Sequence, residues 1–178
     1  VCFNRGIIIT SPDGLVWNKH ETQVNKKWCS VCWSQKLNMF CATGLKGDIA
    51  TSPDGDNWTL HSMLMLNWWG VCWSEDLELF CAVSQIDLGK VITSPDGVTW
   101  TEHPAPKYGF RSVCWSSQLK MFCAVGNDCV MTSTNGVDWT QRAGLPQVAW
   151  GLCWSPDLGA FCISAAKGLV MRSPSLFL

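Results

Sequence analysis

Residues 111–142 read RSVCWSSQLKMFCAVGNDCVMTSTNGVDWTQR, and this stretch decides the fold. Its short runs VCWS, FCAVG, VMTS and VDWT are rich in β-branched, aromatic and cysteine residues, and turn-like clusters such as SQLK and TNG separate them. Such runs, joined by links of about four residues, predict four antiparallel strands connected by hairpins. Because no part of the sequence shows sustained helical periodicity, we expect an all-β protein.

The same unit recurs along the whole chain. One set of tryptophans lies at 17, 58, 100 and 139, spaced by 41, 42 and 39 residues, and a second set at 33, 73, 115 and 154 is spaced by 40, 42 and 39. A tandem four-stranded repeat of this length is typical of a β-propeller. We predict a single propeller domain over residues 1–178, with partial repeats at about 1–27 and 149–178 and repeats at 28–67, 68–109 and 110–148.

About five blades are represented in this reading. Strands one and four occur four times each, and strands two and three occur five times each, so the first and last blades are incomplete. The count suits a tight five-bladed ring, and it equally suits an arc of a propeller with about six to eight blades. An open ring exposes a strand edge, so we expect closure through the ring itself, a partner copy or further residues.

A Ser-Pro-Asp-Gly turn precedes most of the first-set tryptophans. It occurs at 11–14, 52–55 and 94–97, and Ser133-Thr134-Asn135-Gly136 keeps the same chemistry without proline. The serine caps the turn, the proline presets φ, and the glycine takes a position with positive φ. The segment therefore predicts a tight link between two strands.

These Ser-Pro-Asp-Gly-x-x-Trp segments resemble the Asp-box of sialidase-type (BNR-like) repeats, whose usual form is Ser-x-Asp-x-Gly-x-x-Trp. The resemblance implies a propeller but little about activity, because Asp-boxes occur in sialidases, sortilin-like receptors, glycan hydrolases and photosystem assembly factors. In such repeats the box lies between strands three and four, away from the binding face. The resemblance thus implies a structural turn role for the equivalent residues Asp13, Asp54, Asp96 and Asn135.

Composition argues against several partner classes. A net charge of −1 with 15% charged residues indicates no basic surface for nucleic acid. No segment approaches the ~20 apolar residues of a membrane span, so we expect a soluble protein without one. No motif for a cofactor or a metal stands out, since no Cys-x-x-Cys pair recurs at zinc-finger spacing apart from Cys29-x-x-Cys32, and only three histidines exist, at 20, 61 and 103. We expect neither a cofactor nor a metal.

Cysteines recur in pairs nine residues apart, one pair in each repeat: Cys32 and Cys41, Cys72 and Cys81, Cys114 and Cys123, Cys153 and Cys162. On a hairpin of strands one and two, each pair faces its partner across the strands, which leaves cross-strand disulfides open. The total of eleven is odd, and a bond closing so short a loop adds little stability. We therefore favour reduced thiols that pack as small apolar groups between blades.

Candidate binding residues lie just before strand one of each repeat. Four tryptophans outside the regular sets occupy this place, and Tyr108 and Arg111 occupy it in their own blade; the tryptophans are Trp28, Trp68, Trp69 and Trp150. In propellers this link and the link after strand two surround the central channel on the face that binds ligands. The links after strand two differ in length and charge while the strands stay alike, as in a fixed scaffold with a variable surface.

We therefore predict a non-enzymatic binding or scaffold module for a protein partner or assembly, with a glycan-binding lectin as the alternative. A sialidase-type hydrolase fits less well, because it needs three clustered arginines and a tyrosine paired with a glutamate. The chain has only Arg5, Arg111, Arg142 and Arg172, and the repeat places no glutamate beside Tyr108. No catalytic residue is assigned.

Overall fold

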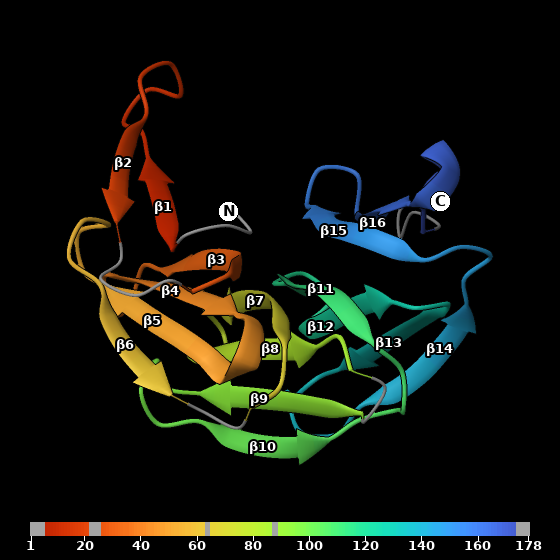
Figure 1. Ribbon diagram of the computed structural model, residues 1–178. Coiled ribbons are helices and arrows are strands. Elements are labelled where there is room, and N and C mark those ends of the chain that lie inside the picture. Colours follow the sequence, from red (N-terminus) through yellow and green to blue (C-terminus); the bar gives the residue numbers. More distant parts are fainter. Residues whose placement is uncertain (1–5, 22–25, 63–64, 87–88, 174–178) are drawn as a thin grey trace.

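The computed structural model describes residues 6–21, 26–62, 65–86 and 89–173, which form five antiparallel sheets. Figure 1 shows these sheets as blades arranged in an arc around a common centre. Blade one contains β1 (Ile7–Thr10) and β2 (Asn18–Glu21). Blade two contains β3 (Trp28–Ser34), β4 (Met39–Gly44), β5 (Asp48–Ser52) and β6 (Thr59–Ser62). Blade three contains β7 (Trp68–Ser74), β8 (Leu79–Ser84), β9 (Lys90–Ser94) and β10 (Thr101–Pro104).

The remaining sheets repeat this order. Blade four contains β11 (Phe110–Ser116), β12 (Met121–Gly126), β13 (Cys129–Ser133) and β14 (Thr140–Gly144), and blade five contains β15 (Ala149–Ser155), β16 (Ala160–Ala165) and β17 (Val170–Arg172). Single 3-10 turns, Leu45–Gly47 and Ala166–Gly168, follow β4 and β16. The all-β class and the four-stranded antiparallel blades are confirmed, with about five blades represented. The first predicted copy of strand two falls on residues 1–5, outside the described part of the chain.

Two strand boundaries differ from the prediction. Strand one begins three residues before the VCWS run, because the residues ahead of that run also pair with strand two. Strand four begins one residue after its tryptophan, so Trp58, Trp100 and Trp139 lie in the turn that precedes it. Their indole nitrogens donate to the turn, as in the 3.0 Å bond from Trp100 Nε1 to the carbonyl of Gly97. That bond holds the ring over the turn instead of within the strand.

The inner strands share a second irregularity, a register shift between their first and third residues. It occurs between Trp28 and Ser30, Trp68 and Gly70, Phe110 and Ser112, and Ala149 and Gly151. A shift of this kind is a β-bulge, which leaves one residue unpaired and re-aims its side chain. The second residue of each of these inner strands is therefore unpaired, and its side chain is aimed differently from those of its neighbours.

The hydrophobic core lies between blades. Cys41 and Ile49 of blade two pack against Trp68, Phe80 and other residues of blade three, and all four of these side chains have no exposed surface. Equivalent clusters join blades one and two, three and four, and four and five. Each blade therefore buries its apolar surface against its neighbours, as expected for stacked repeats.

Cysteines lie directly opposite each other on strands one and two, as the spacing predicts. Cys32 pairs with Cys41, and Cys72 with Cys81, in the antiparallel register, and the later blades repeat the arrangement. The ten described cysteines all carry free thiols. Within the described ranges no helix has the length and apolarity that a membrane crossing requires.

Candidate binding site at the mouth of the blade arc

Loops on one face of the arc are tied together in the same way in blades two to five. The amide that follows strand two donates to the carbonyl that precedes strand one: Leu45 to Lys27, Gln85 to Asn67, Asn127 to Gly109 and Ala166 to Val148, at 2.7–3.1 Å. We call this side, where the inner strands begin, the mouth face. The opposite side, which carries the Ser-Pro-Asp-Gly turns, is the turn face. Backbone bonds of this kind give the mouth face a fixed framework.

The bulge residues of the inner strands lie on the mouth face, and they are Cys29, Trp69, Arg111 and Trp150. They occupy one position of the repeat, yet a cysteine, an arginine and two tryptophans fill it. The residue before each of them stays apolar and buried, as at Trp68 and Phe110. The repeat thus keeps the scaffold constant and varies the side chain that each bulge presents.

Three of these residues form a stack across blades three, four and five. The guanidinium carbon of Arg111 lies 5.2 Å from the ring centre of Trp69 and 4.3 Å from that of Trp150. A cation held over an aromatic face within about 6 Å is attracted by the ring quadrupole. Trp150 keeps 53% of its surface exposed, so one side of the stack is open to solvent.

Arg111 makes fewer hydrogen bonds than its donors allow. Its Nη2 donates to Asn127 Oδ1 at 3.3 Å, whereas its buried Nε has no acceptor among the described residues. No described carboxylate forms an ion pair with it. Burial lowers the pKa of the guanidinium from its ordinary value, because the charged form loses water. The stack therefore holds a cation that an anion would stabilise.

The other predicted binding residues do not share this exposure. Trp28 and Trp68 were expected on the link before strand one, but they are the first residues of β3 and β7, with 1% and 0% of their surface exposed. Trp28 and Trp68 pack in the clusters between blades, and the bulge re-aims the residue that follows each of them. Tyr108 lies on the expected link but is half-buried against the core of blades three and four, and its hydroxyl accepts from Gln141.

A basic cavity lies on the same face, beside blade two. It has a volume of about 280 Å³ and is lined by Lys26, Lys27, Leu45, Lys46 and Asp48. Lys26 is paired with the buried carboxylate of Asp48 at 2.5 Å. The composition does not predict this cavity. The varied links after strand two, which include Lys46 and Asn127, do predict that the variable surface lies on this face.

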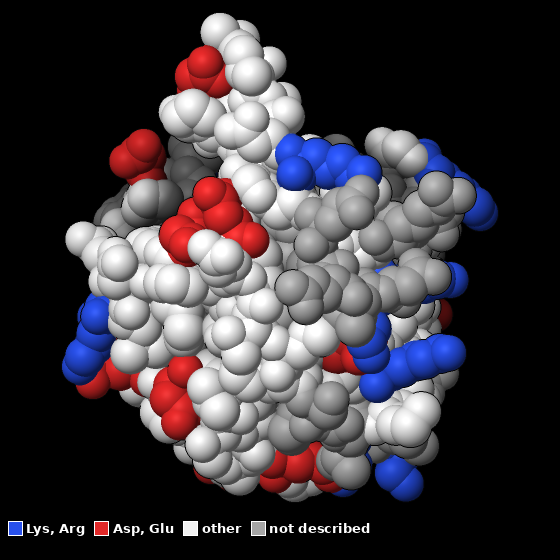
Figure 2. Space-filling model, turned by 60° about the vertical axis from the view of Figure 1, so that its left-hand side comes forward, with Lys and Arg blue, Asp and Glu red and all other residues white. Residues whose placement is uncertain are grey.

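Charge is divided between the two faces. The described mouth-face links and the first two residues of the strands they enter carry seven cations, Lys26, Lys27, Lys46, Lys90, Lys107, Arg111 and Lys167, against Asp48 and Asp128. The links of the turn face carry nine carboxylates, Asp13, Asp54, Asp56, Glu75, Asp76, Glu78, Asp96, Asp138 and Asp157, against Lys36 and Lys120. Figure 2 shows acidic side chains spaced along one side of the molecule. The net charge of −1 therefore conceals a basic mouth face and an acidic turn face.

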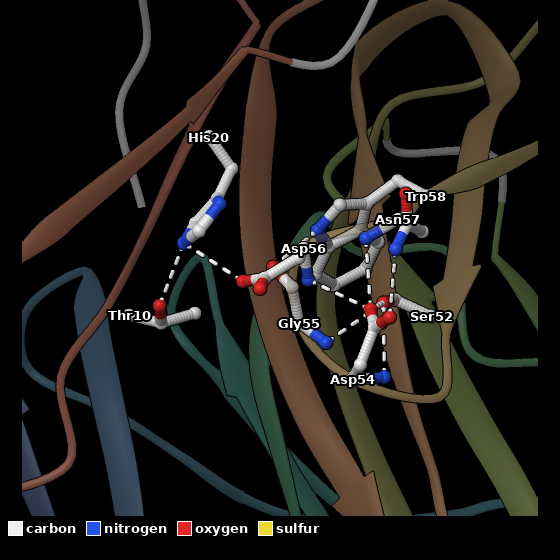
Figure 3. Close-up of polar contacts among 8 residues, drawn as sticks. All are labelled: Thr10, His20, Ser52, Asp54, Gly55, Asp56, Asn57 and Trp58. Atoms are coloured by element: carbon white, nitrogen blue, oxygen red, sulfur yellow. Dashed lines mark hydrogen bonds and ion pairs between the residues drawn. The ribbon is translucent and has the colours of Figure 1, made fainter.

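The turn residues form a repeated local network. In Figure 3, Asp54 Oδ1 accepts from the amides of Asp56 and Asn57 at 2.9 and 2.8 Å, and the amide of Gly55 donates to Ser52 Oγ at 2.8 Å. Asp13, Asp96 and Asn135 accept equivalent amide bonds in their own turns. Each turn glycine adopts a positive φ between 75° and 82°, as its sequence predicts. These bonds lower the pKa of the Asp54 carboxyl and bring that of Asp96 to about 2, although burial of Asp96 opposes them.

Each turn also meets the preceding blade. His20 Nε2 lies 2.7 Å from Thr10 Oγ1 and 3.2 Å from Asp56 Oδ1 of the next blade (Figure 3). The Thr-His contact recurs at Thr51 and His61, and at Thr93 and His103. The histidines thus join the third and fourth strands of their own blades, and His20 also contacts the turn of the next blade. The Thr10-His20-Asp56 set is not a nucleophilic triad, because both partners meet the same ring nitrogen.

The sequence matches no protein-family model and no curated protein sequence. Among solved structures, virginiamycin B lyase from Staphylococcus aureus superposes with a TM-score of 0.78 at 12% identity, covering 94% of this chain and 59% of that chain. The WD40 β-propeller domain of Doa1 superposes at 0.68 with 14% identity, covering 96% and 59%. A nidogen/laminin complex gives 0.76 at 12%, covering 94% and 71%.

This chain therefore spans only 59% of the length of the lyase that it matches. At these identities the likeness shows the fold alone, and the Asp-box character of the turns stays a resemblance. The neighbours and the blade geometry together show that the chain is built as a repeat β-propeller.

Proposed function

We propose that this propeller is a non-enzymatic binding module that presents its mouth face to a protein partner. The observation that carries the proposal is the Trp69-Arg111-Trp150 stack, in which a half-exposed indole and a partly desolvated cation stand on a rigid framework. Tryptophan and arginine are the residue types most enriched among the energetic centres of protein interfaces. The bulges place them side by side from three different blades.

The structural neighbours do not decide between a binding module and an enzyme. They include a lyase as well as a WD40 domain and a nidogen/laminin complex. A sialidase-type site finds little support here, because Arg142 lies on the outer strand β14 and donates to Thr132 of β13, while Arg111 lies on the inner strand β11. The proposal of a binding module therefore rests on the mouth face itself.

Glycan binding is the second candidate, and the exposed indole of Trp150 favours it, since sugars stack on such rings. A lectin with one aromatic site in each blade finds no support, because the equivalent residues in blades two and four are Cys29 and Arg111. Only one exposed ring of this kind stands among the four described bulge residues.

The experiment is selection of binding peptides from a displayed library, followed by affinity measurement with two matched variants. Trp150→Ala removes the exposed ring of the mouth face, and Trp17→Ala removes a ring that is 55% exposed in the turn of blade one. We expect Trp150→Ala to weaken peptide binding at least about tenfold and Trp17→Ala to leave it unchanged. Equal effects, or selection of peptides that bind both variants as well as the parent, would contradict the proposal.

A further inference from the structure

We propose that the mouth face recognises an acidic peptide segment, with one peptide carboxylate held by Arg111 between Trp69 and Trp150. This inference rests on the proposed binding function and names the chemistry of the partner. Its starting observation is that Arg111 lacks any described carboxylate partner and has a buried Nε without an acceptor.

The stack restricts how Arg111 can bind. Indole rings at 5.2 and 4.3 Å occupy the neighbourhood of its guanidinium carbon, and Asn127 takes a bond from Nη2. The donors of a guanidinium lie in its plane and match the two oxygens of a carboxylate. Because Nε is enclosed, a carboxylate would reach the guanidinium through its terminal Nη groups, where it would gain hydrogen bonds and neutralise a charge that the stack has already removed from water in part.

The surrounding charge favours a segment with several carboxylates. Lys27, Lys46, Lys107 and Lys167 are exposed on the mouth face, and none has an ion pair with a described carboxylate. The turn face carries most of the acidic links, which repel an acidic peptide. Together the two faces would steer such a peptide to the mouth, since complementary potentials raise the rate of productive encounter.

A nucleic acid fits these observations less well. Binding to a phosphate backbone needs a dense basic stripe that neutralises many phosphates, and the whole chain has a net charge of −1. The mouth-face lysines are spread over four blades, and among them is one arginine, Arg111, whose Nε has no acceptor among the described residues. Spaced carboxylates on an extended peptide match this pattern more closely.

The test uses the whole chain and a short fluorescein-labelled peptide of alternating glutamate and glycine, followed by fluorescence anisotropy. We expect saturable binding that weakens as salt increases, and binding at least about tenfold weaker for the matching glutamine peptide. Arg111→Gln should lose at least about tenfold, and Arg111→Lys should recover only part, because lysine lacks the planar fork. Lys36→Gln, a charge-matched change on the turn face, should leave affinity unchanged.

Several outcomes would overturn the inference. They are equal binding of the glutamate and glutamine peptides, no loss in Arg111→Gln, and tighter binding of a single-stranded oligonucleotide or a sialylated sugar than of the glutamate peptide. The glutamine-peptide comparison uses the unaltered protein, so it stays decisive even if a variant misfolds. Neutral library peptides that depend on Trp150 but not on Arg111 would refute the acidic-peptide inference while leaving the proposed binding function intact.

Discussion

At the scale of single residues, the bulge position of the inner strand varies between blades, while the residue before it stays in the core. Trp68 is a core residue with no exposed surface, whereas its neighbour Trp69, the bulge residue, lies beside Arg111. Two adjacent tryptophans look alike in the sequence, so their separate fates depend on a register shift that hydrophobic pattern alone does not reveal. The Ser-Pro-Asp-Gly turn, by contrast, is readable directly, because each of its residues has its own turn chemistry.

Thiol reactivity gives a test at this scale. Cys153 is exposed, whereas Cys41 and Cys81 have no exposed surface and burial raises the pKa of both thiols. Because the thiolate is the reactive form, we expect iodoacetamide to label Cys153 first and these two only on unfolding. Peptide mass mapping after brief labelling checks this, and equal labelling of Cys41 and Cys153 would refute the packing described for blade two.

The tryptophans provide a matched pair of stability tests. Trp100 is 8% exposed and packs beside Phe80 with ring centres 6.3 Å apart, whereas the equivalent Trp17 is 55% exposed. We expect Trp100→Ala to lower the free energy of unfolding by about 3–5 kcal/mol. Trp17→Ala should change it by no more than about 0.5 kcal/mol. Urea denaturation of both variants measures the difference, and similar losses would show that Trp17 also packs in the folded protein.

At the scale of elements, the outer strand of one blade is joined to the turn of the next. Each third-strand threonine contacts a histidine of the fourth strand, as Thr10 contacts His20. The turn of the next blade packs against the same threonine so closely that a Cβ added at Gly55 would lie 3.0 Å from Thr10 Cγ2. The strand pattern was predictable from the sequence because it repeats. The contact between the outer strand and the next turn was not predictable, since it brings together residues of different repeats that no local pattern relates.

The histidines at these contacts make the stability of the folded protein depend on pH. Burial lowers the pKa of His61 and of His103 below 6.5, which outweighs the nearby carboxylates of Asp96 and Asp138. The folded state then binds fewer protons than the unfolded state, so this contribution is complete above about pH 6.5 and is lost as the pH falls through the lowered pKa values. The turn carboxylates, whose pKa values lie below 3.8, add a separate loss only in more acidic solution.

Thermal unfolding between pH 7.5 and 5.5 tests the histidine contribution. We expect the melting temperature to fall across this range and the fall to be smaller in the double variant His61→Gln and His103→Gln. The charge-free glutamine has no protonation cost, which is the physical reason for the flatter profile. An unchanged slope in the double variant would assign the pH dependence to other groups.

At the scale of the whole molecule, the division of charge between faces is the feature that the sequence concealed most completely. Composition sums the seven mouth-face cations with the nine turn-face carboxylates, and the sum says nothing about either face. The repeat did predict which links share a face, so the arrangement follows once strand order is known. What no pattern supplied was the stacking of Arg111 between tryptophans of two other blades.

The central claim is that the mouth face, and not the turn face, is the binding surface. Hydrogen–deuterium exchange of the chain with and without a library-selected peptide tests it most directly. We predict slower exchange on binding in segments 65–70, 105–111 and 145–151, which include the bulge residues Trp69, Arg111 and Trp150 and the links before them, with no change in the turns at 53–58 and 95–100. Protection of those turns with an unchanged mouth face would contradict the account.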